Sequence, residues 1–302
     1  MTAVVALGGN ALMRPGERGT AAEQRANLRE ACAALRPLLD EQRLVVTHGN
    51  GPQVGNELLR QERAAAEAPP LPLYLAVAQT QAEIGALIES ELAPVAGLPV
   101  VCLLTHVLVA EDDPAFEEPT KPIGPFYDEA KARELEAERG WKVVHDAGRG
   151  WRRVVPSPAP LEVVELDAIR SLLAAGTIVV ACGGGGIPAT RRGEHLAGID
   201  AVIDKDRASS LLARSLDADR LVILTEVPAV YSGFGTDSQQ ELRELSADDA
   251  AALVPELASG SMRPKVEASV EFVRATGRES LITSPSALAD ALAGRSGTRI
   301  QP

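Results

Sequence analysis

The chain contains little lysine, few aromatic residues and few cysteines. Only 3% of its 302 residues are aromatic, and its three cysteines, Cys32, Cys102 and Cys182, lie far apart inside apolar segments. An odd set without a Cys-x-x-Cys pair excludes a disulfide scaffold and indicates reduced core residues in a cytoplasmic protein. No run of about 18 apolar residues is present. No basic and apolar leader opens the sequence, so we expect neither a membrane span nor a signal peptide.

Acidic residues outnumber basic ones, 42 to 30, which gives a net charge of -12 at pH 7. This balance argues against nucleic acid or an anionic membrane as a partner bound through bulk electrostatics. An anionic ligand therefore needs a local cationic site. Because only five of the 30 basic residues are lysines, the position of each lysine is informative.

Short apolar segments of strand length alternate along the chain with amphipathic segments of helical period. The predicted strands cover 3–7, 44–47, 99–104, 177–182, 201–203, 221–224 and 280–283, and the predicted helices cover 21–39, 53–66, 74–92, 166–174, 207–216 and 265–275. Fully apolar strands are typical of a parallel sheet buried on both faces. The pattern predicts an α/β sandwich whose ligands bind at the carboxyl ends of the strands.

The segment from about residue 112 to residue 160 differs from the rest, because it is rich in proline and glycine and encloses one charged helix near 128–139. Such a long excursion is typical of a small subdomain or a lid.

Glycine-rich turns follow three of the predicted strands: Gly8-Gly9-Asn10, Gly49-Asn50-Gly51 and Gly183-Gly184-Gly185-Gly186. Without a Cβ in the way, backbone N–H groups can approach an anion. Each turn alone is more often only a tight turn, but three at one sheet edge favour an anion site. None fits a P-loop or a dinucleotide-binding pattern, so the positive charge must come from elsewhere in the chain.

The five lysines are the candidates for that charge. Lys131 and Lys142 lie in or beside the charged helix and are interpreted as solvated surface. Lys205 and Lys265 fall in the predicted first turns of helices, where the macrodipole disfavours a cation by about 0.3–1 kcal/mol. A bound polyanion would offset that penalty, whereas a capped helix with an ion pair between Lys205 and its neighbours Asp204 and Asp206 is the alternative explanation.

Other kinds of site have less support. The four histidines show no metal-ligand spacing, and Ser157, Ser261 and Cys182 lack the setting of an activated nucleophile. The chemistry that fits best is phosphoryl transfer, in which lysine, backbone N–H groups and Mg²⁺ offset the charge of the transferred group.

Seven segments together resemble the carbamate kinase family within the amino acid kinase superfamily. They are residues 6–12, 47–55, 119–127, 152–158, 183–188, 201–206 and 261–267. The resemblance runs nearly end to end, and the Pro119-Thr120-Lys121-Pro122 segment is specific to that family. It implies a single domain over 1–302, built as a three-layer αβα sandwich with an open, mainly parallel eight-stranded sheet and a small protruding subdomain.

The resemblance also implies the reaction ATP + carbamate ⇌ ADP + carbamoyl phosphate with Mg²⁺, run toward ATP. In this interpretation the N-terminal half holds the carbamoyl substrate, residues from about 114 to 158 form the lid, and those from about 177 to 302 bind the nucleotide. The expected assembly is a cytoplasmic homodimer of arginine metabolism, without nucleic acid or membrane partners.

Individual roles follow from the resemblance by position. The catalytic set would be Lys121, Lys205, Asp206 and Lys265; the phosphate and substrate set Gly8, Gly9, Asn10, Gly49, Asn50, Gly51, Gly183 and Gly184; and the nucleotide set Asp204, Tyr231 and Met262. No residue is assigned as a metal ligand, because Mg²⁺ would bind through the nucleotide phosphates. Arg263 and Leu257 depart mildly from the family pattern at the rim of the nucleotide pocket.

Two alternatives stay open. One is a kinase of another small acid on the same fold, and the other is a nucleotide-sensing regulator built on a kinase scaffold. A regulator is expected to have lost a charged group at Lys121, Lys205, Asp206 or Lys265, and the chain retains all four.

Overall fold

The structure, a computed structural model, describes residues 1–14, 16–39, 43–146, 150–258 and 262–302. Within these residues, eight strands form one sheet in the order β15-β17-β16-β12-β1-β2-β9-β3. Their bounds are β1 Thr2–Leu7, β2 Arg43–His48, β3 Val100–Cys102, β9 Ile178–Val180, β12 Arg220–Leu224, β15 Glu244–Ser246, β16 Ser280–Thr283 and β17 Thr298–Gln301. Neighbouring strands are parallel except β16 and β17, which confirms the predicted mainly parallel sheet.

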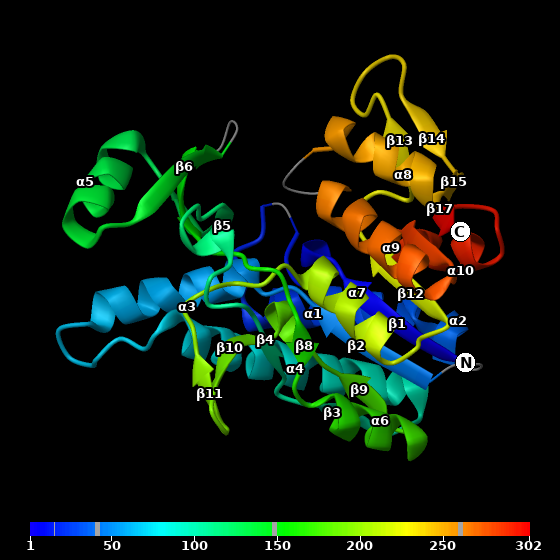
Figure 1. The fold of residues 1–302 in the computed structure, drawn as a ribbon, viewed down its shortest axis with the longest axis horizontal. Coiled ribbons are helices and arrows are strands. Elements are labelled where there is room, and N and C mark those ends of the chain that lie inside the picture. The colour runs from blue at the N-terminus through cyan, green and yellow to red at the C-terminus, as the bar shows by residue number, and fades with distance from the viewer. Residues whose placement is uncertain (15, 40–42, 147–149, 259–261) are drawn as a thin grey trace.

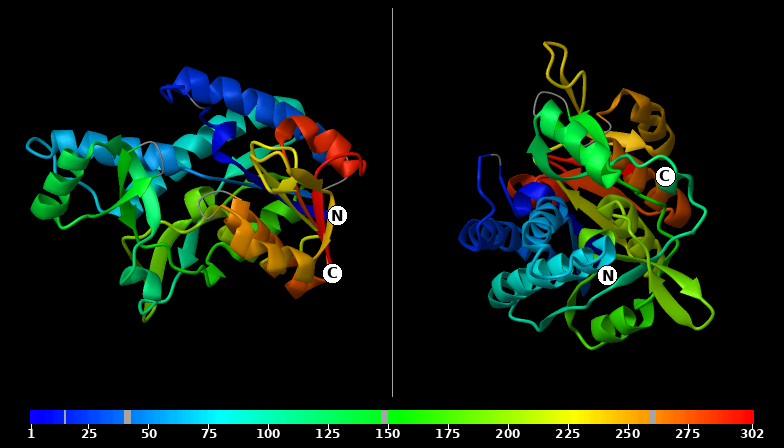
Figure 2. Two further views of the ribbon diagram at one scale, coloured as in Figure 1. Left: turned by 90° about the horizontal axis from the view of Figure 1, so that it is seen from above. Right: turned by 90° about the vertical axis from the view of Figure 1, so that its left-hand side faces the viewer.

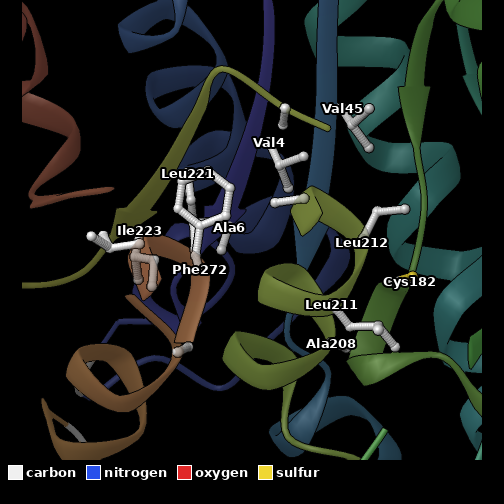
Figure 3. Close-up of a cluster of buried hydrophobic side chains, with 14 of the residues drawn as sticks. Val4, Ala6, Val45, Cys182, Ala208, Leu211, Leu212, Leu221, Ile223 and Phe272 are labelled. Atoms are coloured by element: carbon white, nitrogen blue, oxygen red, sulfur yellow. The ribbon is translucent and has the colours of Figure 1, made fainter. Parts of the chain in front are cut away.

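Strand β1 shows why these apolar segments form a central sheet. From Ala3 to Leu7 it is wholly buried, and its side chains alternate between two hydrophobic clusters. Val4 and Ala6 point into the cluster drawn in Figure 3, which also contains Phe272, while Val5 and Leu7 point into the cluster on the opposite face. A strand covered on both faces needs apolar residues at every position, so the run is continuous.

Helices cover both faces of the main sheet (Figure 2, left). On one face lie α6 (Leu166–Ala174), α7 (Lys205–Ser215), α8 (Ala247–Leu253) and α9 (Met262–Thr276); on the other lie α1 (Ala21–Ala34), α2 (Arg36–Leu39), α4 (Leu73–Ala96) and α10 (Leu288–Leu292). The predicted three-layer sandwich is therefore confirmed.

Smaller elements complete the body. A second sheet has the order β11-β10-β4-β8, and a hairpin pairs β13 with β14. Their bounds are β4 His106–Leu108, β8 Glu162–Val163, β10 Ile187–Arg192, β11 His195–Gly198, β13 Val230–Ser232 and β14 Gln240–Leu242. Helix α3 (Gly51–Ala64) follows the turn after β2 and packs against α4.

A separate unit projects from the body at the upper left of Figure 1. It consists of the three-stranded sheet β5-β7-β6 and helix α5, and we call these four elements the projecting unit. Their bounds are β5 Lys121–Tyr127, α5 Glu129–Arg139, β6 Lys142–Asp146 and β7 Gly150–Val155. Both tryptophans of the chain, Trp141 and Trp151, belong to this part of the molecule.

The projecting unit contacts the body through α3. The backbones of Gly55 in α3 and Gly124 in β5 approach so closely that a Cβ on Gly55 would overlap Gly124. Around this contact, Ile123 and Val155 of the unit pack with Val54 of α3 in a small hydrophobic cluster.

Two predicted elements differ from the structure. The strand predicted over 201–203 is wrong: the segment is buried but pairs in no sheet, and Val202 donates its N–H to the carbonyl oxygen of Pro156. The helix predicted over 21–39 breaks after Ala34, because Pro37 has no N–H to continue the helical ladder. Apolar character predicted burial correctly in both places, but not the hydrogen bonding.

Among the described residues, no helix is both long and apolar enough to cross a membrane. Cys32 and Cys182 are buried, Cys102 is half-buried, and all three are free thiols.

Candidate active site

The carboxyl ends of three neighbouring strands bring the glycine turns to one edge of the main sheet. Strands β1, β2 and β9 are adjacent and parallel, and Gly8, Gly49 and Gly183 come shortly after their last residues. The prediction of a shared edge is therefore confirmed. Glycine is required at Gly8, because a Cβ there would lie 2.6 Å from the carbonyl oxygen of Leu224. The side chain of Asn10 and the whole of Ser261 lie outside the described part of the chain.

Side chains from other elements fill the space beside the turn after β9. A Cβ on Gly183 would overlap the imidazole of His48, and a Cβ on Gly184 would overlap the amide of Asn50. Gly184 has a φ of +67°, and Cys182 before it has a φ of +49°, which is unusual for a residue with a side chain. Positive φ at alternate positions, with Gly183 between these two residues, is typical of turns whose N–H groups converge on an anion.

Two buried polar residues of α4 hold these turns in place. Gln81 donates its side-chain N–H to the carbonyl oxygen of Gly183 at 2.8 Å and accepts the backbone N–H of Thr105 at 2.6 Å. Thr80 accepts a hydrogen bond from the side-chain amide of Asn50 at 2.9 Å. These bonds satisfy polar groups that would otherwise be buried without partners, so they fix the relative positions of the turns.

His48, the last residue of β2, is fully buried between the turns. Its Nδ1 lies 2.9 Å from the carbonyl oxygen of Gly49, so Nδ1 carries the hydrogen and Nε2 keeps a free lone pair. Among the described residues, Nε2 has no hydrogen-bond partner. Burial and, to a smaller extent, the charge of Lys205 lower the pKa of His48, while the bond to Gly49 raises it. The resulting pKa is about 4, so the imidazole is neutral at neutral pH.

Lys205 and Lys265 are joined through one buried carboxylate. Lys205 is the first residue of α7, Lys265 lies in the first turn of α9, and the two helices pack together. Asp206 accepts a hydrogen bond from Lys205 through Oδ1 and one from Lys265 through Oδ2 at 3.0 Å. The side chains of both lysines are 12% exposed and that of Asp206 is 4% exposed. We call these three side chains, the two lysines Lys205 and Lys265 and the aspartate Asp206 between them, the lysine triad.

Burial and charge act on the lysine triad in opposite directions. Burial alone would raise the pKa of Asp206, but the ammonium groups of Lys205 and Lys265 outweigh it and lower that pKa. Burial lowers the pKa of Lys205, Asp206 raises it and Lys265 lowers it, with a downward net shift. The triad places two cations and one anion at helix N-termini, and a bound anion would offset the excess positive charge.

Lys121 reaches this region from the projecting unit. Its Nζ donates to Oδ2 of Asp204 at 2.6 Å, a pairing between residues 83 positions apart. Burial alone would raise the pKa of Asp204, but Lys121 and Lys205 lower it well below its usual range. The sequence assigned Asp204 to the nucleotide, whereas in the structure its carboxylate contacts Lys121 and the N-terminus of α7.

A cleft of about 1080 Å³ opens beside the lysine triad. Gly8, Gly9, Tyr231, Met262 and Lys265 are among its lining residues. Within the described part of the chain, the remaining predicted residues lie outside this lining: Gly49, Asn50, Gly51, Lys121, Gly183, Gly184, Asp204, Lys205 and Asp206. The site therefore has a spacious side next to Lys265 and a tightly packed side at the turns after β2 and β9.

Acidic side chains near the triad are already engaged by lysines. In the described residues, no group of three His, Cys, Asp or Glu side chains is arranged to hold a metal ion. Asp204 and Asp206 bind Lys121, Lys205 and Lys265 instead.

Comparison with known proteins agrees with this fold. The sequence profile of the Amino acid kinase family matches residues 1–284. The carbamate kinase of Halobacterium salinarum is 45% identical over 302 residues, covering 99% of this chain and 98% of that protein. The solved carbamate kinase of Giardia lamblia bound to citric acid has 42% identity and a TM-score of 0.93, covering 99% of this chain and 98% of that one. The same Giardia enzyme bound to AMP-PNP has 41% identity and a TM-score of 0.91, with equal coverage.

The chain belongs to the carbamate kinase family.

The candidate site of this carbamate kinase family member includes side chains that the sequence interpretation missed. Thr80 and Gln81 are polar residues at buried positions of α4, and that pairing inside an apolar helix is a signal that could have revealed them. Phe234 lines the cleft, is 66% exposed, and lies with its ring 6.0 Å from that of Tyr231. Two adjacent aromatic faces at a cleft suit a planar ligand ring, and an aromatic residue between two glycines is notable in a chain with so few.

Proposed function

We propose that this chain catalyses the reversible reaction ATP + carbamate ⇌ ADP + carbamoyl phosphate and works in the direction that makes ATP. The observation that carries the proposal is the lysine triad, which lies at the same sheet edge as three glycine turns and beside a cleft large enough for a nucleotide. Full-length relatives that bear the name carbamate kinase support the choice of substrate.

In the direction of ATP synthesis, a terminal phosphate oxygen of ADP attacks the phosphorus of carbamoyl phosphate. The bond between that phosphorus and the carbamoyl oxygen breaks, and carbamate leaves with the electron pair. Lys205 and Lys265 would donate to the oxygens of the transferred group while Asp206 orients both ammonium groups. Lysine suits this task because its ammonium is a compact point charge.

The remaining residues divide between the two ends of the reaction. We assign Gly8, Gly9 and Asn10 to the phosphate chain, Gly49, Asn50, Gly51, Gly183 and Gly184 to the carbamoyl end, Tyr231 and Met262 to the nucleotide, and Lys121 to the transferred group. Apart from Gly183 and Gly184, the assignment places the carbamoyl side in the N-terminal half, the nucleotide side from about residue 177 to 302, and a lid from about residue 114 to 158. The AMP-PNP complex of the Giardia relative supports the use of ATP.

Mg²⁺ enters this proposal together with the nucleotide. The carboxylates of Asp204 and Asp206 are engaged by lysines, which fits a cation held by phosphate oxygens rather than by protein side chains. When bound there, Mg²⁺ would neutralise part of the phosphate charge.

The test is ATP formation from ADP and carbamoyl phosphate by the purified chain in the presence of Mg²⁺. ATP formation by the unmodified chain that is lost in Lys205→Ala supports the proposal. ATP formation from acetyl phosphate but not from carbamoyl phosphate would identify a kinase of another small acid and overturn it. Binding of ADP without any phosphoryl transfer would overturn it in favour of a nucleotide-sensing regulator.

We also propose a cytoplasmic homodimer that takes part in arginine metabolism. The three free cysteines support a reducing compartment. The dimer and the pathway rest on the family alone. Light scattering on the purified chain measures the mass in solution, and a monomer at working concentration would contradict the dimer.

A further inference from the structure

The two carboxylate oxygens of Asp204 accept hydrogen bonds from two different elements. Oδ1 accepts the backbone N–H groups of Asp206 at 2.9 Å and Arg207 at 3.3 Å, which makes Asp204 the N-cap of α7. Oδ2 accepts the ammonium of Lys121 from β5 at 2.6 Å. One side chain therefore connects the helix that carries Lys205 to the projecting unit that carries Lys121.

The arrangement around Asp204 parallels that of the lysine triad. Asp206 divides its two oxygens between Lys205 and Lys265, and Asp204, two residues earlier, holds the third lysine. Each ammonium group has three N–H donors, so a lysine that gives one of them to an aspartate keeps two for another acceptor. The three lysines and two aspartates together carry one excess positive charge.

We propose that Asp204 is a positioning residue that holds Lys121 over the site, so that the lysine from the projecting unit meets the transferred phosphoryl group. This inference rests on the proposed function. It differs from the nucleotide role that the sequence suggested for Asp204, because Asp204 is absent from the described lining of the cleft that contains Tyr231 and Met262.

Two features make the pairing suited to positioning. The side chain of Asp204 is 13% exposed and its cap bonds fix it, whereas the side chain of Lys121 is 33% exposed and comes from a separate sheet. A fixed, ionised carboxylate restricts a long flexible side chain through a charge-assisted hydrogen bond. Without it, Lys121 would sample many rotamers and bind the phosphoryl group less often.

The decisive experiment is a double-mutant cycle between Asp204 and Lys121. Asp204→Asn keeps an oxygen that can cap α7 and removes the charge, and Lys121→Met removes the ammonium at similar length. We expect Asp204→Asn to lower kcat/KM for carbamoyl phosphate by about 10- to 100-fold, the size of a lost charge-assisted hydrogen bond. The KM for ADP is expected to change less than about twofold.

The readout that separates positioning from a structural role is the double variant. If Asp204 acts through Lys121, adding Asp204→Asn to Lys121→Met causes no further loss of kcat/KM. The proposal would be overturned if Asp204→Asn lowered kcat/KM by the same factor in the Lys121→Met background as in the unmodified chain. A rise in the KM for ADP in Asp204→Asn, with an unchanged KM for carbamoyl phosphate, would also overturn it.

Controls keep the outcome interpretable. Asp204→Ser retains a good N-cap residue and replaces Asp204→Asn if that variant does not fold. Asp128→Asn changes the exposed N-cap of α5 and is expected to leave kcat/KM unchanged. Turnover of the unmodified chain is measured first: its absence would refute the proposed function, whereas an active chain with an insensitive Asp204→Asn variant refutes only the role of Asp204.

Discussion

Strand β1 of the main sheet is buried from Ala3 to Leu7, whereas strand β5 of the projecting unit has one buried residue, Ile123. Guanidinium groups lie over aromatic rings in the unit, with Arg133 4.4 Å from the centre of the Trp151 ring. Such contacts contribute about 0.5–1 kcal/mol each at exposed sites, less than full burial of one large apolar side chain. We therefore expect the projecting unit to open at lower free energy than the main sheet.

This difference matters because the cations of the site are divided between the two regions. Lys205 and Lys265 belong to helices packed on the main sheet, and Lys121 belongs to the projecting unit, which we expect to be less stable. The position of the unit therefore decides whether all three ammonium groups are together. If the unit acts as the proposed lid, Lys121 is the one cation of the three that would shift when substrate enters, while the triad stays in place.

The largest expected effect is a loss of kcat when a lysine of the body is removed. Lys205→Ala or Lys265→Ala is expected to lower kcat by about 1,000-fold or more, because each removes a preorganised cation from the transferred group. Far-UV circular dichroism should show a retained fold. Lys131→Ala, at an exposed lysine of α5, serves as the control and should keep full activity. Full activity in either triad variant would contradict the assignment.

Acid should weaken the body specifically through His48. The folded pKa of about 4 lies below the ordinary value of 6.5, so between these values the unfolded chain binds more protons than the folded chain. The free energy of unfolding is therefore expected to fall as the pH is lowered through this window, by about 3 kcal/mol in total. In urea unfolding at several pH values, the free energy of unfolding of His48→Gln should depend less on pH than that of the unmodified chain. The control His195→Gln, at an exposed histidine, should behave like the unmodified chain. Equal slopes in all three proteins would disprove this account.

The joint between the two regions should respond to one added methyl group. Gly55→Ala places a Cβ where Gly124 already lies, so the projecting unit must shift away from α3. Such overpacking costs about 1–3 kcal/mol, and we expect kcat/KM for carbamoyl phosphate to fall by about 10-fold and Tm to fall by a few degrees. Arg60→Ala, at an exposed position of the same helix, is the matched control. Unchanged kinetics in Gly55→Ala would show that the contact does not set the position of the unit.

The smallest expected effect is faster amide exchange confined to the projecting unit. Arg133→Ala removes the cation over Trp151, and we expect amide exchange in β6 and β7 to accelerate by about two- to fivefold. Exchange in the main sheet should not change. Arg170→Ala, which removes ion pairing on α6 of the body, should leave exchange in the unit unaffected. Acceleration of exchange throughout the molecule after Arg133→Ala would show that the two regions are not independent.

Much of this arrangement could be predicted from the sequence, because local chemistry determines it. Continuous apolar runs predicted the buried strands, and glycine turns after three of them predicted the shared edge. The segment 201–203 shows the limit: its apolar side chains predicted burial, but a partner strand is a property of the whole fold. The same holds for the pairing of Lys121 with Asp204, since no local pattern joins residues 83 positions apart. Thr80 and Gln81 were missed because their partners, too, come from other elements.

The placement of both tryptophans has a practical consequence. Trp141 and Trp151 belong to the projecting unit, so the intrinsic tryptophan fluorescence of the chain originates entirely from the region whose position completes the site. The molecule thus contains a natural optical reporter of the unit, because the body has no tryptophan. Emission followed during rapid mixing with substrate would report any change around the unit without an attached dye.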